Sequence, residues 1–455
     1  MPTDVFPPRC GGAGWSAHAL AHTLIRRGHD VMALVPQPGA SGLKRDDVLG
    51  VPTLRFGYRA PPVPFVKNYM RHEWLWSRLA DLIVHCAFDS AENKSAAHST
   101  LYPPHSTIIH AQHVQTTPPA VLAGQRLGVP VIVTVRDHWP WDYFATGLHG
   151  DRVPYPQQTI SSLVTDLVAR LGPLRGLAVL PAIPYVLAHV RRRQHFLRQA
   201  DAVIAVSEYI AEKLRAIVLS ERIHVIPNMV DVDAIARTIT EPLHHIAVDE
   251  PFLLFVGKLE RNKGAHLLVD VFRELKNQTI DDGRWRIDSS AHDVSSSPGH
   301  PATLSSCHLV ICGAGPLRPY LERELTALGI NVRFLDWIAH DDVLRLMARC
   351  ELLLFPSAWG EPLSRVLLEA SACGAPILAM PTGGTTDIIT DGVNGALEPT
   401  PECFARRLAD MLAQPEQRRA LGMAAREAAI ERFSASRVMP QVEALYMEVM
   451  RSVRG

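Results

Sequence analysis

Two carboxylates, Glu361 and Glu369, stand eight residues apart in the segment 351–376, ELLLFPSAWGEPLSRVLLEASACGAP. The apolar run that opens this segment is typical of a buried strand, and the later part is typical of a helix. Eight helical residues correspond to roughly 12 Å along the axis, so the two carboxylates are too far apart to share one proton. They could hold two hydroxyl-bearing parts of one elongated ligand. The alternative is that Glu361 caps the helix and Glu369 is an exposed helical residue.

The start of this helix is a candidate anion site. Proline favours the first helical position, where its missing N–H is not needed, so the pattern predicts a helix that begins at Pro362. The amides of Leu363, Ser364 and Arg365 would then be available to an anion, with the helix dipole in favour. Glu361 would lie at the mouth of that site.

Two lysines in FVGKLERNKG (255–264) could serve the same ligand. Lys258 follows an apolar strand pattern, and Lys263 opens the next helical pattern. Parallel strands bring such loops to one edge of a sheet, where two ammonium groups could neutralise a diphosphate leaving group without a metal ion. The alternative is a pair of solvated loop lysines.

Two other motifs predict structure rather than chemistry. The run CGAGPL (312–317) resembles the start of a dinucleotide-binding fingerprint, but Arg318 stands where the last glycine is required. We therefore interpret it as a tight strand-to-helix turn. Asp231 and Asp233 could be read as a metal-binding pair, yet they precede a helical pattern and are better explained by helix capping.

The first half of the chain carries a less distinctive set of polar residues. Gly12 lies in a glycine-rich turn, GGAG (11–14), that precedes a helical pattern. This turn could admit the close approach of a phosphate or sugar, or it could be a plain turn. Two strand patterns also end in polar side chains, which the pattern alone does not rank. They are His110, His113, Arg136, Asp137 and His138.

These residues need a framework of strands and helices to position them. Short apolar runs alternate with amphipathic helical patterns in both halves, which indicates α/β domains of the Rossmann-like type with ligands at the carboxyl ends of the strands. We predict one domain over 1–228 and a second over 229–433, with the helical residues 434–455 packing back on the first. Residues 279–306 are predicted to be an inserted loop. The last helices are expected at 401–413, 415–430 and 435–452.

The first domain lacks an obvious first strand. Only MPTDVF precedes the glycine turn, where a Rossmann-like domain would carry an apolar strand. Either that strand is very short, or the stated start lies downstream of the true one. We expect the second.

Composition narrows the function classes. The 455 residues include 46 Lys+Arg and 46 Asp+Glu, so no basic excess favours a nucleic acid partner. The seven cysteines form no C-x-x-C pair and no basic, apolar leader opens the chain, which indicates a cytoplasmic protein. Residues 174–199 combine an apolar run with Arg191–Arg193. This segment is either a core helix with a basic end or one that lies in a membrane interface at the inner face of the membrane.

The ordered set of motifs resembles the family 4 glycosyltransferases of the GT-B fold. The motifs are PPRCGGAG, VSEYI, IPNMVD, FVGKLERNKG, CGAGPL, FLDWI and GEPLSRVLLEA, and they span most of the chain. The resemblance implies two Rossmann-like domains that face each other across a cleft. It also implies transfer of a hexosyl group from a nucleotide sugar to a glycan or lipid-linked acceptor, with retention of anomeric configuration. It implies no cofactor and no catalytic metal.

The resemblance further assigns donor-binding roles. Glu369 would hydrogen-bond the ribose hydroxyls of the nucleotide, and Ile338 would lie against the base. Glu361 would hold the donor sugar beside the amides of Leu363 and Ser364. In such a mechanism the leaving phosphate can itself take the proton of the acceptor, so a strong protein base is not required.

The departing diphosphate would be stabilised by Lys258 and Lys263, and Gly12 would approach it from the first domain. At two of the donor-binding positions, this sequence differs from the residue that is more frequent in the family. Lys258 stands where arginine is more frequent, which keeps the charge and loses bidentate geometry. Ser364 replaces a frequent glycine, although its amide remains usable.

A third departure concerns the acid–base chemistry. Arg136 stands where many relatives have a histidine that touches the donor sugar, and arginine cannot act as a base. His138, two residues on, lies on the same side of an extended chain. These features leave a second hypothesis open, in which the chain is a catalytically silent nucleotide-sugar or glycan-binding subunit. A sugar-nucleotide epimerase on the same fold is a third and less favoured hypothesis.

Overall fold

The computed structural model describes residues 1–59 except Arg9, 73–92, 107–150 except Val114, 153–154, 158–243, 246, 248, 251–282 and 308–452. The chain forms two compact units. Unit 1 comprises Met1–Thr146, Gln157–Met229 and Ala435–Gly455, and unit 2 comprises Gly147–Pro156 and Val230–Ser434. This division departs from the predicted domain limits mainly at Gly147–Pro156, which contains the hairpin of β6 (Leu148–His149) and β7 (Val153–Pro154).

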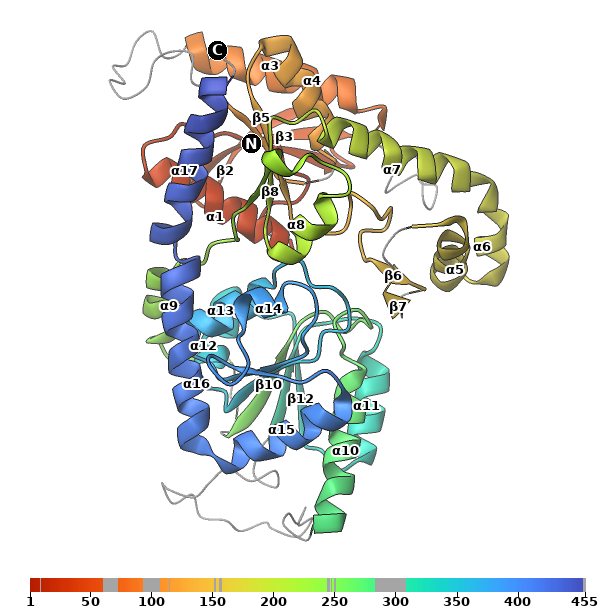
Figure 1. The fold of residues 1–455 in the computed structure, drawn as a ribbon, viewed down its shortest axis with the longest axis vertical. Coiled ribbons are helices and arrows are strands. Elements are labelled where there is room, and N and C mark those ends of the chain that lie inside the picture. The colour runs from red at the N-terminus through yellow and green to blue at the C-terminus, as the bar shows by residue number, and fades with distance from the viewer. Residues whose placement is uncertain are drawn as a thin grey trace. The chain divides into compact units, whose positions relative to one another are not determined.

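Unit 1 contains a four-stranded parallel sheet and a three-stranded sheet (Figure 1). The parallel sheet has the order β4-β5-β8-β9, with bounds Ile109–Ala111, Val131–Val135, Ala202–Ala205 and Ile223–Val225. In the second sheet, β3 (Val51–Tyr58) pairs in parallel with β1 (Ala33–Pro38) and antiparallel with β2 (Leu43–Val48). Unit 1 also has α1 (Gly12–Arg26), α3 (Trp76–Glu92), α4 (Thr117–Leu127) and α8 (Glu208–Leu214).

The first three residues take up the position of a short strand in unit 1. The amide of Leu34 donates to the carbonyl of Met1 at 3.0 Å, and the amide of Thr3 donates back to Leu34 at 2.9 Å. On the other side, the amide of Gln112 donates to the carbonyl of Pro2 at 3.0 Å. These bonds connect β1 to the end of β4. A very short extended segment therefore precedes α1, where a Rossmann-like domain would carry a longer apolar strand.

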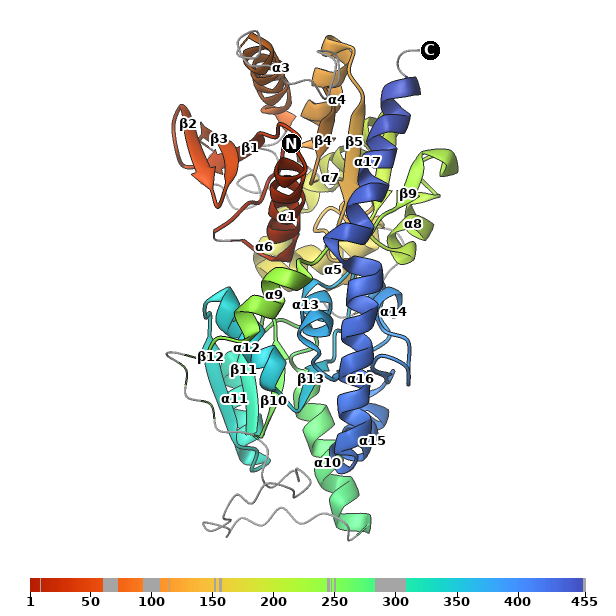
Figure 2. The same cartoon turned by 90° about the vertical axis from the view of Figure 1, so that its left-hand side faces the viewer.

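Helix α17 (Ala435–Ser452), from the end of the chain, belongs to unit 1 and contacts α1 there (Figure 1 and Figure 2). Val438, Met439 and Val442 are buried with Leu20 of α1 in one apolar cluster. A polar clamp supplements this packing, because the guanidinium of Arg27 donates two hydrogen bonds of 2.7 Å to Glu443. A second polar link is buried: His110 Nδ1 lies 2.7 Å from the hydroxyl of Tyr446.

Three helices of unit 1 form a small separate core. They are α5 (Ile160–Leu171), α6 (Pro173–Ala178) and α7 (Ile183–Leu197), with a 3₁₀ turn at Leu180–Ala182. Residues including Leu163, Leu167, Val186 and Val190 are buried together. The core-helix interpretation of 174–199 therefore holds for α7.

The basic tract at the end of α7 does not form one exposed face. Arg193 is buried, and Arg192 donates hydrogen bonds of 2.9 and 2.7 Å to the carboxylate of Glu73. Arg191 is the exposed member. In the described part of the chain, no helix is long and apolar enough to cross a membrane.

Unit 2 is built on a six-stranded parallel sheet of order β12-β11-β10-β13-β14-β15. The bounds of β10 to β15 are Phe252–Val256, His308–Cys312, Val332–Asp336, Leu352–Phe355, Ile377–Ala379 and Ala396–Leu397. The central runs are apolar throughout because helices cover both faces of such a sheet. The helices are α9 (Val232–Ile239), α10 (Leu267–Asp282), α11 (Arg318–Ala327), α12 (His340–Arg349), α13 (Arg365–Cys373), α14 (Thr385–Ile388), α15 (Pro401–Ala413) and α16 (Pro415–Ala428).

The helix limits test two predictions directly. The three final helices are confirmed, and a π-helical turn at Ala429–Phe433 follows α16. The predicted loop 279–306 is wrong at its start, because α10 continues through Asp282. Of the rest of that segment, residues 283–306 lie outside the described residues.

Candidate functional site

The carboxylate of Glu361 is buried at the end of the loop that follows β13. Its Oε1 accepts hydrogen bonds from Lys263 Nζ at 2.6 Å and from Ser357 Oγ at 2.9 Å, and Glu361 is only 3% exposed. The ammonium of Lys263 also lies 4.6 Å from the centre of the Trp359 ring. The structure thus brings together Lys263, from the loop after β10, and Glu361, from the loop after β13, which belong to two separate motifs in the sequence.

Two glycines allow these loops to meet. Gly264 has a φ of +68°, and a Cβ atom there would lie 1.6 Å from the carbonyl oxygen of Pro356. Gly383, after β14, has a φ of +55°, and a Cβ there would lie 2.4 Å from the carbonyl oxygen of Glu361. Only glycine fits either position, because both the backbone angle and the space exclude a side chain. Three loops at the carboxyl edge of the sheet therefore converge on Glu361.

Glu369 lies one turn into α13 and is 4% exposed. Its Oε1 accepts from His340 Nε2 at 2.9 Å and forms an ion pair with Arg365 Nε at 2.6 Å. Burial opposes ionisation, but Arg365 and His340 outweigh it and lower the pKa of Glu369 below its usual value of 4.5. Glu369 is therefore a buried, charged acceptor, and the interpretation of it as an exposed helical residue is wrong.

The predicted start of α13 is also wrong. The helix begins at Arg365, three residues after Pro362, and Ser364 is its N-cap with Oγ accepting from the amide of Leu367 at 3.4 Å. Serine is among the best N-cap residues, so it overrides the preference of proline for the first turn. The amide of Arg365 belongs to the first turn as expected, whereas Leu363 precedes the helix. Capping is done by Ser364, which excludes that role for Glu361.

Lys258 and Ile338 lie at other points of the same sheet edge. Lys258 is exposed just after β10, and Ile338 is half-buried two residues after β12. In the described residues no acidic side chain pairs with Lys258. The neighbouring turn at 312–317 has the structural role predicted for it. A Cβ atom on Gly313 would lie 1.9 Å from the carbonyl oxygen of Gly257, so the two loops pack backbone to backbone.

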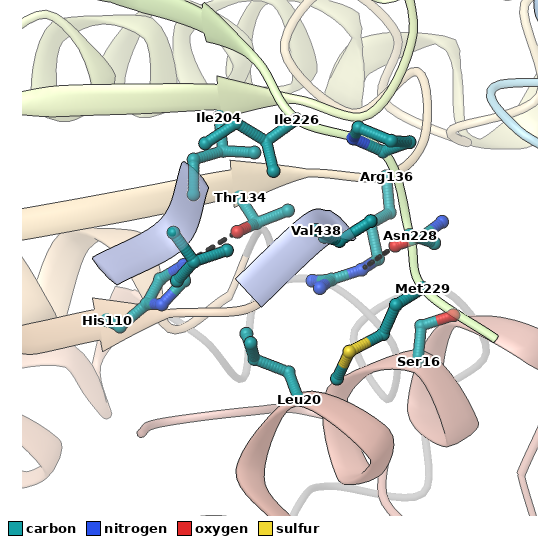
Figure 3. A pocket seen from close by; sticks show the side chains of 12 residues that line it. Ser16, Leu20, His110, Thr134, Arg136, Ile204, Ile226, Asn228, Met229 and Val438 are labelled. Atoms are coloured by element: carbon teal, nitrogen blue, oxygen red, sulfur yellow. Dashed lines mark hydrogen bonds between the residues drawn. The ribbon is translucent and has the colours of Figure 1, made fainter. Parts of the chain in front are cut away.

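In unit 1, Arg136 points into a pocket between α1, the parallel sheet and α17 (Figure 3). Its Nε donates to Asn228 Oδ1 at 2.8 Å and its Nη1 donates to the carbonyl of Gln112 at 3.2 Å. Burial lowers the pKa of Arg136 to about 9. Burial, with the charge of Arg136, also lowers the pKa of His110 far below 6.5.

His138 and Gly12 are placed differently from Arg136. His138 is buried, and its Nδ1 accepts from Trp141 Nε1 at 3.2 Å. The two side chains therefore take different partners, Asn228 for Arg136 and Trp141 for His138. Gly12 is the exposed first residue of α1. In the same turn, a Cβ on Gly14 would lie 2.6 Å from Cys10 Sγ, so Gly14 is the position that close packing restricts.

The two halves of the chain match two family descriptions in succession. Residues 10–234 match "Glycosyltransferase Family 4" and residues 236–428 match "Glycosyl transferases group 1". The chain belongs to the group 1 glycosyltransferases, of the family 4 type. Together the two matches span the motifs on which the resemblance rests, and they confirm the predicted family.

Solved structures show that this chain has the GT-B fold. Sucrose-phosphate synthase from Thermosynechococcus elongatus has a TM-score of 0.64 at 19% identity, covering 99% of this chain and 100% of that one. Anabaena HepE, solved in complex with UDP and glucose, has a TM-score of 0.62 at 18% identity, covering 98% and 99%. At these identities the likeness establishes the fold alone.

Curated relatives match part of the chain. The alpha-D-kanosaminyltransferase of Streptomyces kanamyceticus is 26% identical over 268 residues, which are 56% of this chain and 62% of the relative. The chain spans less than two thirds of the length of the first curated relatives that it matches.

Sequence reasoning missed two residues of the candidate site. His340 is the first residue of α12, after the strand FLD, and its position past the carboxyl end of a parallel strand is the signal that could have found it. Ser357 ends the run ELLLFPS and could have been found in the same way. In the residues that the structure describes, no group of three or more His, Cys, Asp and Glu side chains could hold a metal ion.

Proposed function

We propose that this transferase moves a hexosyl group from a nucleotide-diphosphate sugar to a glycan or lipid-linked acceptor, with retention of anomeric configuration and without a metal ion. One observation carries the proposal. In unit 2, Glu361 and Glu369 are both buried, both are paired with cations, and the hydrogen bonds from Lys263, Ser357 and His340 that hold the two carboxylates fall on Oε1. The second oxygen of each carboxylate is therefore left for a ligand hydroxyl.

The nucleotide would bind through Glu369. A buried carboxylate with a lowered pKa is charged at neutral pH, and a charged acceptor forms stronger hydrogen bonds with hydroxyls than a neutral one. Oε2 of Glu369 would accept from the ribose, while His340 and Arg365 hold Oε1 in place. Ile338 would lie against the base.

The sugar and the diphosphate would bind around Glu361. Oε2 of Glu361 would accept from a hydroxyl of the donor sugar. Lys263, 27% exposed at its side chain, and the exposed Lys258 would stabilise the charge on the leaving diphosphate together with the first-turn amides of α13. This charge is the largest that develops in the reaction, so its stabilisation is the main catalytic effect.

The transfer step conserves atoms and charge. The bond between C1 of the sugar and the oxygen of the β-phosphate breaks, and the acceptor oxygen bonds to C1 on the same face. The acceptor proton passes to the departing phosphate oxygen. Because that oxygen serves as the base, the step is compatible with an arginine at position 136.

The donor class has partial support from the comparisons. Anabaena HepE, similar in fold, is described in complex with UDP and glucose, which makes a UDP-hexose the first donor to test. GDP- and ADP-hexoses are the alternatives. The acceptor would be met in the cytoplasm, either free or at the inner face of the membrane, in the synthesis of a polysaccharide or glycoconjugate.

The test is slow hydrolysis of UDP-, GDP- and ADP-hexoses by the purified chain in EDTA. We expect turnover of one donor, loss of at least about 100-fold on Glu369→Ala, and little change on Glu427→Ala, an exposed glutamate of α16. Donor binding with no turnover, even with membrane extracts as acceptors, would favour a silent binding subunit. No binding of any donor would refute both.

A further inference from the structure

Arg136 is a cation of unit 1 that forms no ion pair with any carboxylate of the described residues. It directly follows β5, and its side chain lines a pocket with residues of α1 and α17 (Figure 3). Its two hydrogen bonds go to uncharged acceptors, Asn228 Oδ1 and the carbonyl oxygen of Gln112. Asp137, the next residue, accepts instead from the amide of Trp139 at 2.9 Å. A half-buried cation without a counter-ion is costly unless a ligand supplies the opposite charge.

The guanidinium of Arg136 keeps free donors for such a ligand. Nε uses its single N–H on Asn228, and Nη1 uses one of its two on Gln112. Both N–H groups of Nη2 and one of Nη1 have no partner in the described residues. Figure 3 shows the tip of the side chain directed into the pocket, on the side away from Asn228. The two terminal nitrogens of an arginine can bind both oxygens of one carboxylate.

The other polar groups of the pocket offer donors rather than free acceptors. Because Oδ1 of Asn228 accepts from Arg136, the remaining polar atom of that amide is Nδ2, a donor. The hydroxyl of Ser16, from α1, also lines the pocket and has no partner in the described residues. His110 and Thr134 are bonded to each other at 2.7 Å, and the lowered pKa of His110 keeps its ring neutral. The described residues that line the pocket include no aspartate and no glutamate.

The size of the pocket favours a carboxylate over a phosphate. Its enclosed space admits roughly one or two groups the size of a water molecule. The two oxygens of a carboxylate match that space, whereas a phosphate group brings more oxygens than it admits. Among sugars, the hexuronic acids carry a carboxylate, at C6.

We propose that Arg136 binds the carboxylate of a hexuronic acid in this pocket of unit 1. Asn228 holds the guanidinium in place, and both residues follow strands of the parallel sheet, at the edge where such sheets bind ligands. The inference rests on the proposed function, because the carboxylate belongs to one of the two sugars that the transfer joins. Two sources carry this chemistry: a nucleotide-diphosphate hexuronate as donor, and a glycan that ends in a hexuronate as acceptor.

Calorimetric titrations of the full chain in EDTA distinguish the two sources. The donor arm compares UDP-glucuronate with UDP-glucose, which differ only by the carboxylate at C6. The acceptor arm compares sodium D-glucuronate with D-glucose, each added to the chain after saturation with UDP. We expect the carboxylate ligand to bind at least about tenfold more tightly than its neutral counterpart in one of the two arms. The arm that shows the preference identifies the source.

Two variants test whether Arg136 causes the preference. Arg136→Gln removes the cation. Asn228→Asp keeps an acceptor for Nε and places a counter-ion beside the guanidinium, so it neutralises the site without removing a side chain, and it decides the test if Arg136→Gln does not fold. Both variants should lose the preference for the carboxylate ligand. Gln125→Glu, at an exposed glutamine of α4 outside the pocket, changes the net charge of unit 1 as Asn228→Asp does and should keep the preference.

Two results would overturn the inference. The first is equal affinity for the carboxylate and neutral ligands in both arms, which would leave the proposed function intact as long as UDP binds. The second is a preference that persists in Asn228→Asp, since the carboxylate would then bind elsewhere. If no nucleoside diphosphate binds, the acceptor arm is repeated without UDP. A preference for D-glucuronate that Asn228→Asp abolishes would then support the carboxylate site and refute the proposed function.

Discussion

Lys263 Nζ lies 2.6 Å from Oε1 of Glu361, and this contact joins the loops after two neighbouring strands of unit 2. The carboxylate is almost fully buried while the ammonium is 27% exposed at its side chain. Such a pair can keep a charged carboxylate inside the protein and still present a cation to a ligand. The same contact would therefore both stabilise unit 2 and hold Lys263 in place for the proposed catalysis.

Removing the lysine should therefore affect both properties. Lys263→Met leaves Glu361 buried without its cation, so we expect the free energy of unfolding of unit 2 to fall by about 2–3 kcal/mol. The double variant Lys263→Met/Glu361→Gln should recover most of that loss and remain inactive. Urea unfolding and donor hydrolysis measure the two effects. Equal stability of the single and double variants would show that the pair is not coupled.

A backbone prediction concerns Gly264. Alanine there would place a Cβ atom 1.6 Å from the carbonyl oxygen of Pro356, so we expect Gly264→Ala to destabilise unit 2 by at least about 3 kcal/mol and to displace Lys263. Gly329→Ala is the control, because Gly329 has a similar φ of +78° with no atom within 4 Å of the added Cβ. That variant should lose only about 1 kcal/mol. Similar losses in the two variants would mean that the close approach is not the restriction.

Acid should destabilise unit 2 in part through Glu369. The folded-state pKa of Glu369 is below 4.5, so its contribution to stability is complete above pH 4.5 and is lost as the pH falls through the lower, folded-state value. We expect Glu369→Gln to be less stable than the unchanged chain at pH 6, and the difference to shrink at pH 3. Unfolding midpoints in urea at the two pH values measure this. A difference that grows in acid has the wrong sign for the proposed pairing with Arg365 and His340.

Unit 1 should respond to pH through a buried histidine instead. Burial, with the charge of Arg136, lowers the pKa of His113 to about 3 from 6.5, and its Nδ1 lies 2.8 Å from Thr3 Oγ1. Between pH 6.5 and pH 3 the unfolded chain binds a proton that the folded chain does not, so stability falls by about 1.4 kcal/mol per pH unit below 6.5. His113→Gln should reduce the slope by that amount between pH 6 and pH 5. An unchanged slope would mean that His113 is protonated in the folded state.

The sequence predicted the framework of unit 2 well because its signals are local. Apolar strand runs and amphipathic helices predicted the sheet of unit 2 apart from its last strand, β15, and the last three helices. The predicted start of α13 was wrong because two local preferences compete there. The preference of serine for the N-cap, at Ser364, prevails over the preference of proline for the first helical position. The partner of Glu369 was not predictable from spacing, since His340 is 29 residues away along the chain. Likewise, nothing local revealed that Arg136 turns into a pocket.

The most direct measurement of the central claim is calorimetric titration, in EDTA, of the donor nucleotide sugar and of its nucleoside diphosphate. If Glu369 binds the ribose and Glu361 binds the sugar, Glu369→Ala weakens both ligands by about tenfold or more, whereas Glu361→Gln weakens the nucleotide sugar and spares the nucleoside diphosphate. Unchanged affinities in Glu369→Ala, or equal loss of both ligands in Glu361→Gln, would contradict the division of roles between the two carboxylates.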